Sequence, residues 1–157
     1  MAEDRWSAAR PWFGLGIRVV LAVVALWAGV AKVTDLEGSV RAVRAFDLLP
    51  SGLEDLVGYA LPVVELILGL LLLAGLLTRW AAAANGLLML AFTIGIASAW
   101  ARGLSIDCGC FGGGGEVDPG ETEYLLDIVR DVALVLASAY LVRWPQSRFS
   151  ADAALRI

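Results

Sequence analysis

The chain has 157 residues, of which 59% are hydrophobic and only 18% are charged, and its net charge is −4. A soluble domain has about 25% charged residues, so this composition argues against a soluble helical bundle and favours a membrane protein. The length is that of one domain, which we expect to cover residues 1–157. We expect the lipid bilayer as its environment and no nucleic-acid partner.

Four apolar stretches are long enough to cross the ~30 Å hydrocarbon core as helices. The first three contain at most one charged residue each, whereas the fourth carries Asp127, Arg130 and Asp131 in its first two turns. These three charges lie at helical spacing on one face, and we expect them to neutralise one another. The sequence therefore predicts an all-α fold, a four-transmembrane-helix bundle with helices at about 15–34, 57–78, 80–101 and 124–143.

The distribution of charges between the two ends of these helices predicts an orientation. The first stretch also fits a secretory signal peptide, but either interpretation puts the segment after Lys32 on the same side. With the N-terminus inside, five of the 12 basic residues lie outside and seven lie inside: Arg5, Arg10, Arg18, Arg79, Arg143, Arg148 and Arg156. This mild positive-inside bias predicts a multi-pass plasma-membrane protein with cytoplasmic termini. The loop 102–123 is then extracytoplasmic, on the oxidising side.

The segment between the first two helices is amphipathic. Residues 36–56 carry apolar side chains at three-residue spacing, at Val40, Val43, Phe46 and Leu49. The pattern predicts a short extracytoplasmic helix, ended by Pro50, that lies on the bilayer or caps the bundle. Two roles stay open for it, a functional lid or a surface helix that only closes the bundle.

The two cysteines, Cys108 and Cys110, stand one residue apart. A metal site needs three or four ligands, and the chain has no histidine and no other cysteine, so we expect no metal unless subunits share a site. A structural disulfide across one residue would constrain almost no chain entropy. Strained, exposed disulfides are typically labile or catalytic, so the pattern favours a redox-active pair.

The loop around the cysteines is rich in glycine. Gly109 permits the unusual backbone dihedrals that a disulfide between its neighbours needs. Phe111 and Gly112 complete the loop backbone, and the glycines at 112–115 would let a partner's backbone or a flat ring approach the sulfurs. Asp107 and Glu116 are expected to disfavour a thiolate, so neither cysteine should have a deeply lowered pKa.

Glu65 lies inside the second helix, where an ionisable group is functional by default. Two interpretations stay open: a proton relay or quinone contact, or a neutral carboxyl hydrogen-bonded to another helix, for example to Asn85. Lys32 and Asp35 flank the outer end of the first helix, and we expect them to be ordinary interface charges. Lys32, Asp35 and Asn85 are the candidates for polar groups around the site.

At these residues the chain resembles a known family. The run CGCFG before the fourth helix, AKVTD at the end of the first and LPVVELILGLLLL in the second are similar to the MauE group, methylamine utilisation protein E, of the DoxX-like redox-associated membrane proteins. The resemblance covers about Leu15 to Val142, and CGCFG is its specific part. Glu65, Lys32 and Asp35 match by position, without an assigned role.

The resemblance implies disulfide handling outside the cytoplasm, with Cys108 and Cys110 as the redox pair. The implied partner is a thioredoxin-fold protein of the MauD or DsbA type, and the founding members serve maturation of a disulfide-rich subunit of methylamine dehydrogenase. We expect the partner's thiolate to attack the Cys108–Cys110 bond, with a membrane quinone as electron acceptor. The alternative is a non-enzymatic assembly factor or oxidase-associated subunit whose cysteines only shape a loop.

Overall fold

The computed structural model describes residues 2–118 and 120–155, with the side chains of residues 2–8 excepted. Arg156 and the side chain of Arg5, both counted toward the predicted orientation, therefore lie outside the described residues. The elements in chain order are α1 (Ala2–Thr34), α2 (Leu36–Ala45), α3 (Leu53–Ala74), α4 (Thr78–Ala101), β1 (Ile106–Asp107), β2 (Gly115–Glu116), α5 (Tyr124–Arg143) and α6 (Ala151–Leu155).

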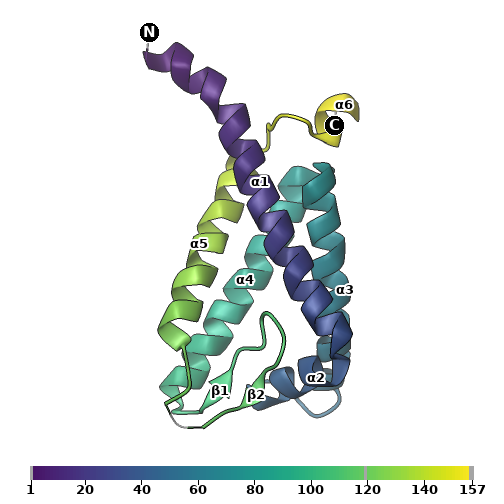
Figure 1. The fold of residues 1–157 in the computed structure, drawn as a ribbon, viewed down its shortest axis with the longest axis vertical. Coiled ribbons are helices and arrows are strands. Elements are labelled where there is room, and N and C mark those ends of the chain that lie inside the picture. The colour runs from purple at the N-terminus through teal and green to yellow at the C-terminus, as the bar shows by residue number, and fades with distance from the viewer. Residues whose placement is uncertain (1, 119, 156–157) are drawn as a thin grey trace.

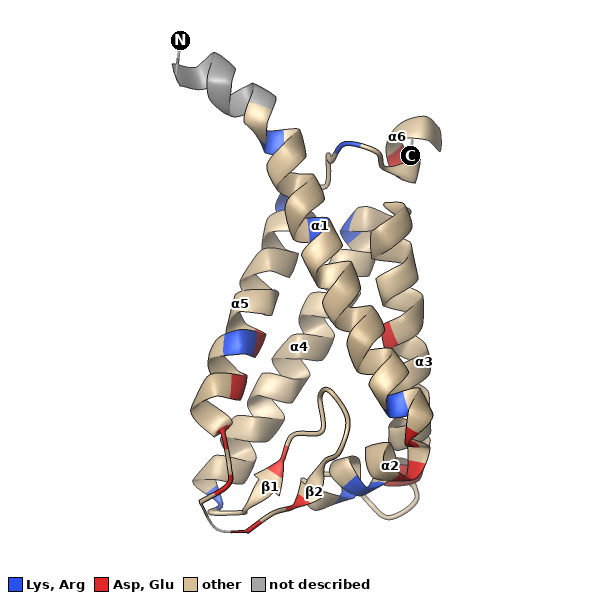
Figure 2. Ribbon diagram, viewed as in Figure 1, with Lys and Arg blue, Asp and Glu red and all other residues tan. Residues whose placement is uncertain are grey.

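The long helices α1, α3, α4 and α5 pack together lengthwise (Figure 1). α1 packs mainly on α3 and α4 mainly on α5, while α3 and α4 touch each other less. One end of the molecule holds the beginning of α1 together with α6 (Figure 1). The other end holds α2 and the β1–β2 hairpin. We call these the terminal end and the hairpin end. Most acidic residues gather at the hairpin end (Figure 2).

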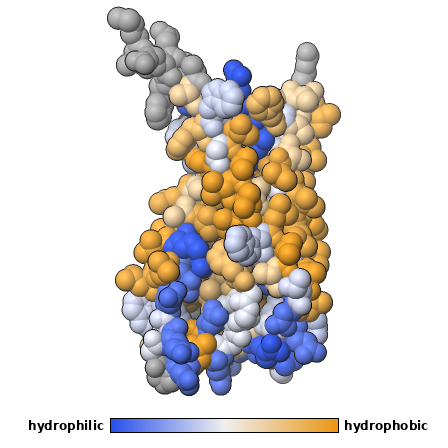
Figure 3. Space-filling model, in the orientation of Figure 1, coloured by the Kyte–Doolittle hydropathy of each residue, from blue (hydrophilic) through white to orange (hydrophobic). Residues whose placement is uncertain are grey.

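Among the described residues, three helices are long and apolar enough to cross a membrane, namely α1 from Ala9 on, α3 and α4. Their outward side chains form a broad hydrophobic surface between more hydrophilic regions (Figure 3). The protein is therefore a multi-pass membrane protein. α5 is less apolar because it carries charges at positions 127, 130, 131 and 143, and its crossing of the membrane remains a prediction.

α1 and α3 approach closely through glycine. A Cβ atom on Gly29 would come within 2.8 Å of Leu66, and one on Gly69 within 2.7 Å of Leu26. Helices in membranes gain most of their association energy from such van der Waals packing, which small residues permit. The pair brings the end of α1, and with it Lys32, against the middle of α3.

The amphipathic segment is helical, but it ends earlier than the sequence predicts. α2 ends at Ala45, five residues before Pro50, because Asp47 adopts a left-handed conformation with φ 47°. Arg102 donates hydrogen bonds to the carbonyl oxygens of Phe46 and Asp47, which the end of the helix leaves free. The placement of α2 outside the cytoplasm remains a prediction.

The loop 102–123 contains a small hairpin that the sequence does not predict. β1 and β2 pair antiparallel, with Ile106 opposite Glu116. The Tyr124 hydroxyl fastens the hairpin to α5: it donates to the Leu104 carbonyl at 2.6 Å and accepts from the Ile106 N–H at 2.9 Å. Strands of two residues are too short to produce an alternating pattern, so periodicity could not reveal them.

The terminal end is closed by residues after α5. The buried guanidinium of Arg18 donates to Ser147 Oγ at 2.8 Å and to the Phe149 carbonyl at 3.0 Å. Asp152 accepts hydrogen bonds from the first backbone N–H groups of α4, at Leu77 and Thr78. Segments that are far apart in the sequence thereby seal the end opposite the cysteines.

Candidate functional site

The two cysteines lie in the turn between β1 and β2, and both are free thiols. Cys108 is half-buried, whereas Cys110 is only 8% exposed. Gly109 between them has φ 65°, and its N–H donates to the Asp107 carboxylate at 3.1 Å. The Cys110 N–H points at Cys108 Sγ, at 3.4 Å. A left-handed glycine therefore turns the chain so that both thiols come together.

The glycine turn lies against α2. A Cβ atom on Gly109 would come within 2.7 Å of Ala42 Cβ, and one on Gly114 within 2.5 Å. The sequence suggested that the glycines leave room for a partner or a flat ring. Of the four glycines at 112–115, Gly115 has open space around it, whereas Gly114, like Gly109, is approached by Ala42 of the chain's own α2, which covers this part of the turn.

Arg130 of α5 is the functional candidate that the sequence analysis missed. Its Nη2 lies 3.9 Å from Cys108 Sγ, and its guanidinium stacks over the Phe111 ring at 4.9 Å. It also pairs with Asp127 at 2.8 Å and with Asp131 at 2.9 Å, so the predicted neutralisation within this triad is confirmed. The spacing of the triad predicted an ion cluster, but the contact of Arg130 with Cys108 Sγ depends on the path of the hairpin, which the spacing does not contain.

The surroundings shift the pKa values of the two thiols in opposite directions. The pKa of Cys108 is lowered, chiefly by a hydrogen bond from the Cys110 side chain, with further contributions from the Cys110 N–H and Arg130. The pKa of Cys110 is raised well above its usual value by the hydrogen bond to Cys108 and by burial. The acidic side chain that raises the pKa of Cys108 is Asp127 of α5 and not Asp107 or Glu116, as the sequence suggested, and the net shift of this pKa is downward.

Lys32 and Glu65 form a buried ion pair beneath the hairpin. Lys32 Nζ lies 2.9 Å and 3.0 Å from the two Glu65 carboxylate oxygens, and it donates to the Cys110 carbonyl at 2.7 Å. The side chains are 5% and 1% exposed. The prediction of an ordinary interface charge at Lys32 is wrong, because α1 ends against α3 and carries the ammonium inside. Of the two interpretations left open for Glu65, a bond to another helix is found, but its partner is Lys32 of α1 and not Asn85, the example given, since Asn85 donates to Ser138 at 3.2 Å.

Asp35 and Phe111 have supporting positions, and Gly112, with φ 97°, lies against Ala31 of α1. Asp35 accepts a hydrogen bond from the Gly38 N–H at 2.8 Å and caps α2, so it shapes the element that covers the turn. Phe111 contacts the Trp27 ring edge-on at 6.3 Å. These contacts hold the turn against α1 and α2.

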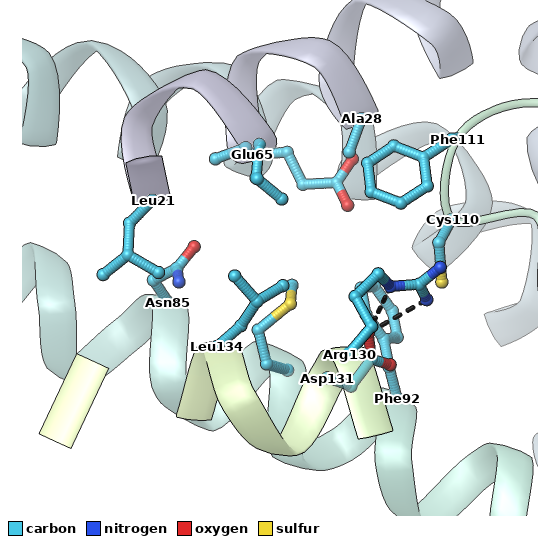
Figure 4. Close-up of a pocket in the computed structure, with 13 residues that line it drawn as sticks. Leu21, Ala28, Glu65, Asn85, Phe92, Cys110, Phe111, Arg130, Asp131 and Leu134 are labelled. Carbon is cyan, nitrogen blue, oxygen red and sulfur yellow. Dashed lines mark hydrogen bonds and ion pairs between the residues drawn. The ribbon is translucent and has the colours of Figure 1, made fainter. Parts of the chain in front are cut away.

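A small cavity joins the cysteine turn to the polar groups inside the bundle (Figure 4). It offers about 10 Å³ to the centre of a water molecule, roughly the space one water needs. Its polar lining comes from α3, α4, the hairpin and α5, through Glu65, Asn85, Cys110, Arg130 and Asp131. In the part of the chain that the structure describes, the second Asp131 oxygen has no hydrogen-bond partner.

A larger pocket of about 270 Å³ lies on the other side of the turn, among α2, α3 and α4. Its lining is mostly apolar, and both cysteines and Lys32 belong to it. Among the described residues, no three potential His, Cys, Asp or Glu ligands lie close enough to share a metal ion. The polar features next to the thiols are therefore the ion pairs of Lys32 and Arg130.

Fold and site together define a small helical membrane protein that holds a cysteine pair over buried charges. The chain belongs to the MauE family: the family model of methylamine utilisation protein MauE matches residues 10–144. The matched range contains the cysteine turn, the Lys32–Glu65 pair and Arg130. No curated protein and no solved structure matches the chain.

Proposed function

We propose that this protein carries out thiol–disulfide exchange through Cys108 and Cys110 with a thioredoxin-fold protein outside the cytoplasm. The observation that carries the proposal is the unequal environment of the two thiols, with Arg130 at 3.9 Å from Cys108 and Cys110 buried behind it. Reactive cysteines typically lie beside a cation with partial exposure, whereas structural cysteines are buried and inert. The family description adds a methylamine-utilisation context, in which an exported protein would be the final substrate.

The two cysteines have different roles in this proposal. In the oxidised protein, the partner's thiolate attacks Cys108 Sγ, the more exposed sulfur, and the bond to Cys110 breaks. Cys110 leaves with the electron pair and takes up a proton, because its buried position disfavours the charged thiolate. A second thiolate of the partner then attacks the mixed disulfide, and Cys108 leaves as a thiolate beside Arg130. The partner gains a disulfide, and the cysteine pair gains two electrons.

The direction of exchange follows from where the thiols lie. Both are at the hairpin end, and the chain has no other cysteine. To deliver reducing equivalents from the cytoplasm, the protein would need a thiol near the terminal end. Oxidation of the partner therefore fits the distribution of sulfur better than its reduction.

Trapping of the mixed disulfide tests the proposal. Cys110→Ala cannot form the Cys108–Cys110 bond, but its Cys108 thiolate can still attack the disulfide of an oxidised partner, which is the reverse of the proposed exchange. Because Cys110 is then missing to complete that reverse reaction, the variant should accumulate a covalent complex with a thioredoxin-fold protein, identifiable by mass spectrometry. The matched variant Cys108→Ala keeps only the buried sulfur and should trap far less. If both variants reach the membrane in normal amounts and neither traps a partner, the cysteines only shape the loop and the protein is an assembly factor.

A further inference from the structure

The apolar pocket beside the cysteine turn lies between two helices that make few contacts with each other. α3 and α4 touch each other less than the pairs α1–α3 and α4–α5 do, and the pocket occupies the space between them under α2. Leu61, two turns inside α3, and Leu88 of α4 line its deep part. The exposed residues Leu48 and Ala91 line it as well. The pocket therefore reaches from the cysteines toward the depth at which lipid covers the helices.

The polar part of this pocket is concentrated at one wall. Cys108, Gly109 and Cys110 line it together with Lys32, whereas Glu65, the partner of Lys32, lines the small cavity on the other side of the turn. Lys32 thus brings a positive charge to the wall of the apolar pocket, where its ammonium pairs with Glu65 and donates to the Cys110 carbonyl. An occupant with an electron-rich oxygen next to the sulfurs meets a positive charge there.

We propose that this pocket binds the ring of a membrane quinone, which reoxidises the cysteine pair; the inference rests on the proposed exchange function. Exchange with a dithiol partner leaves Cys108 and Cys110 reduced, so turnover needs an acceptor of two electrons and two protons. An acceptor that enters through an apolar pocket among membrane helices must itself dissolve in lipid. The quinones are the chemical class that combines these properties. The volume of about 270 Å³ suits one substituted ring, with its tail leaving toward the lipid.

The reaction balances within the site. Two S–H bonds, those of Cys108 and Cys110, break and one S–S bond forms between the sulfurs. Both electrons and both protons pass to the two quinone oxygens, which become the hydroxyl groups of the quinol. Cys108 gives up its proton first, because its pKa is the lower of the two, and its thiolate then begins the reaction while that proton remains available to the quinone oxygens. The ammonium of Lys32 stabilises the negative charge that develops on the nearer quinone oxygen.

A single-turnover measurement with decylubiquinone tests the proposal. The reduced, purified protein in detergent should convert about one equivalent of decylubiquinone to quinol while both thiols disappear. Ala91→Phe fills the pocket from its exposed wall and should slow this step by about tenfold or more. The control Ala84→Phe adds the same ring on an exposed position of α4 that does not line the pocket, and it should leave the rate unchanged.

The exchange reaction supplies the second readout, measured as transfer of the Cys108–Cys110 disulfide to a reduced thioredoxin. Both ring variants should retain this activity, because neither position touches a sulfur. Exchange without quinol formation in the wild-type protein would overturn the quinone site and leave the proposed function standing. Equal quinol formation by Ala91→Phe and the wild type would overturn it as well, and would assign the pocket to a lipid chain. If the wild-type protein transfers no disulfide to thioredoxin, the proposed function itself is contradicted.

Discussion

Arg130 and Asp127 act on the Cys108 sulfur in opposite senses. Arg130 approaches it and stabilises the thiolate, whereas the negative charge of Asp127 raises the pKa of Cys108. The lowered pKa is therefore a balance, in which the hydrogen bond from Cys110 is the largest contribution. A lowered pKa means that the reactive thiolate of Cys108 persists to lower pH than that of an ordinary cysteine.

The balance predicts opposite shifts for two neighbouring substitutions. Arg130→Gln removes the cation, so the pKa of Cys108 should rise and its alkylation by iodoacetamide should require higher pH. Asp127→Asn removes the opposing charge, so the pKa of Cys108 should fall and alkylation should extend to lower pH. The pH profile of Cys108 alkylation, followed by mass spectrometry, measures both. Shifts in the same direction would mean that the substitutions act through the packing of the hairpin and not through charge.

The contact between α2 and the hairpin keeps Cys110 out of solvent. Ser39 Oγ donates to the Gly58 carbonyl at 2.8 Å, which fastens α2 to α3. Ala42 then fills the space above Gly109 and Gly114, both of which have positive φ. Of the two roles left open for the amphipathic segment, this packing favours the lid, since α2 covers the reacting groups.

Gly114 offers a direct test of this cover. Gly114→Ala places a methyl group within 2.5 Å of Ala42 at φ 93°, so it should force the turn away from α2 and cost about 1–3 kcal/mol of stability. Cys110 should then be alkylated faster in the folded protein. Gly115→Ala has comparable backbone strain, with φ 114°, but meets no atom within 4 Å, and it should expose Cys110 much less.

A compensating substitution completes this test. Ala42→Gly in the Gly114→Ala background removes the contact with Ala42 Cβ but leaves the one at 2.9 Å with Gly109 Cα, so it should restore part of the protection of Cys110. If Gly115→Ala exposes Cys110 as strongly as Gly114→Ala does, backbone strain and not the contact with α2 controls access to the thiol.

The features that could be predicted from the sequence are those that depend on a local pattern of residues. The long apolar helices follow from runs of hydrophobic residues, and the cysteine pair from its spacing. The contacts that define the site depend on chain segments far apart: Lys32 lies 33 residues from Glu65 and 78 from Cys110 along the chain. Neither hydrophobic periodicity nor charge spacing contains such pairings, so Lys32 was expected at the surface and Arg130 was expected to serve only its own ion cluster.

The molecule as a whole has two unlike ends. The thiols, α2 and most acidic residues lie at the hairpin end, while Arg18 and Asp152 close the terminal end. If the hairpin end is extracytoplasmic, as the positive-inside bias predicts, a membrane-impermeant maleimide added to intact, reduced cells should label Cys108. Labelling only after lysis would reverse the orientation and remove the argument for an oxidising compartment. A cysteine introduced at Arg148, an exposed position at the terminal end, should behave in the opposite way.

The position of both sulfurs at one end has a consequence for energetics. A thiol pair and an acceptor pocket that share a wall exchange electrons and protons at the same depth in the bilayer. The free energy of an elementary charge changes by about 2.3 kcal/mol per 100 mV of transmembrane voltage when the charge crosses the whole membrane. In this reaction no net charge makes that crossing. The oxidation of the cysteine pair should therefore be electroneutral, and its rate should be the same in energised and de-energised vesicles.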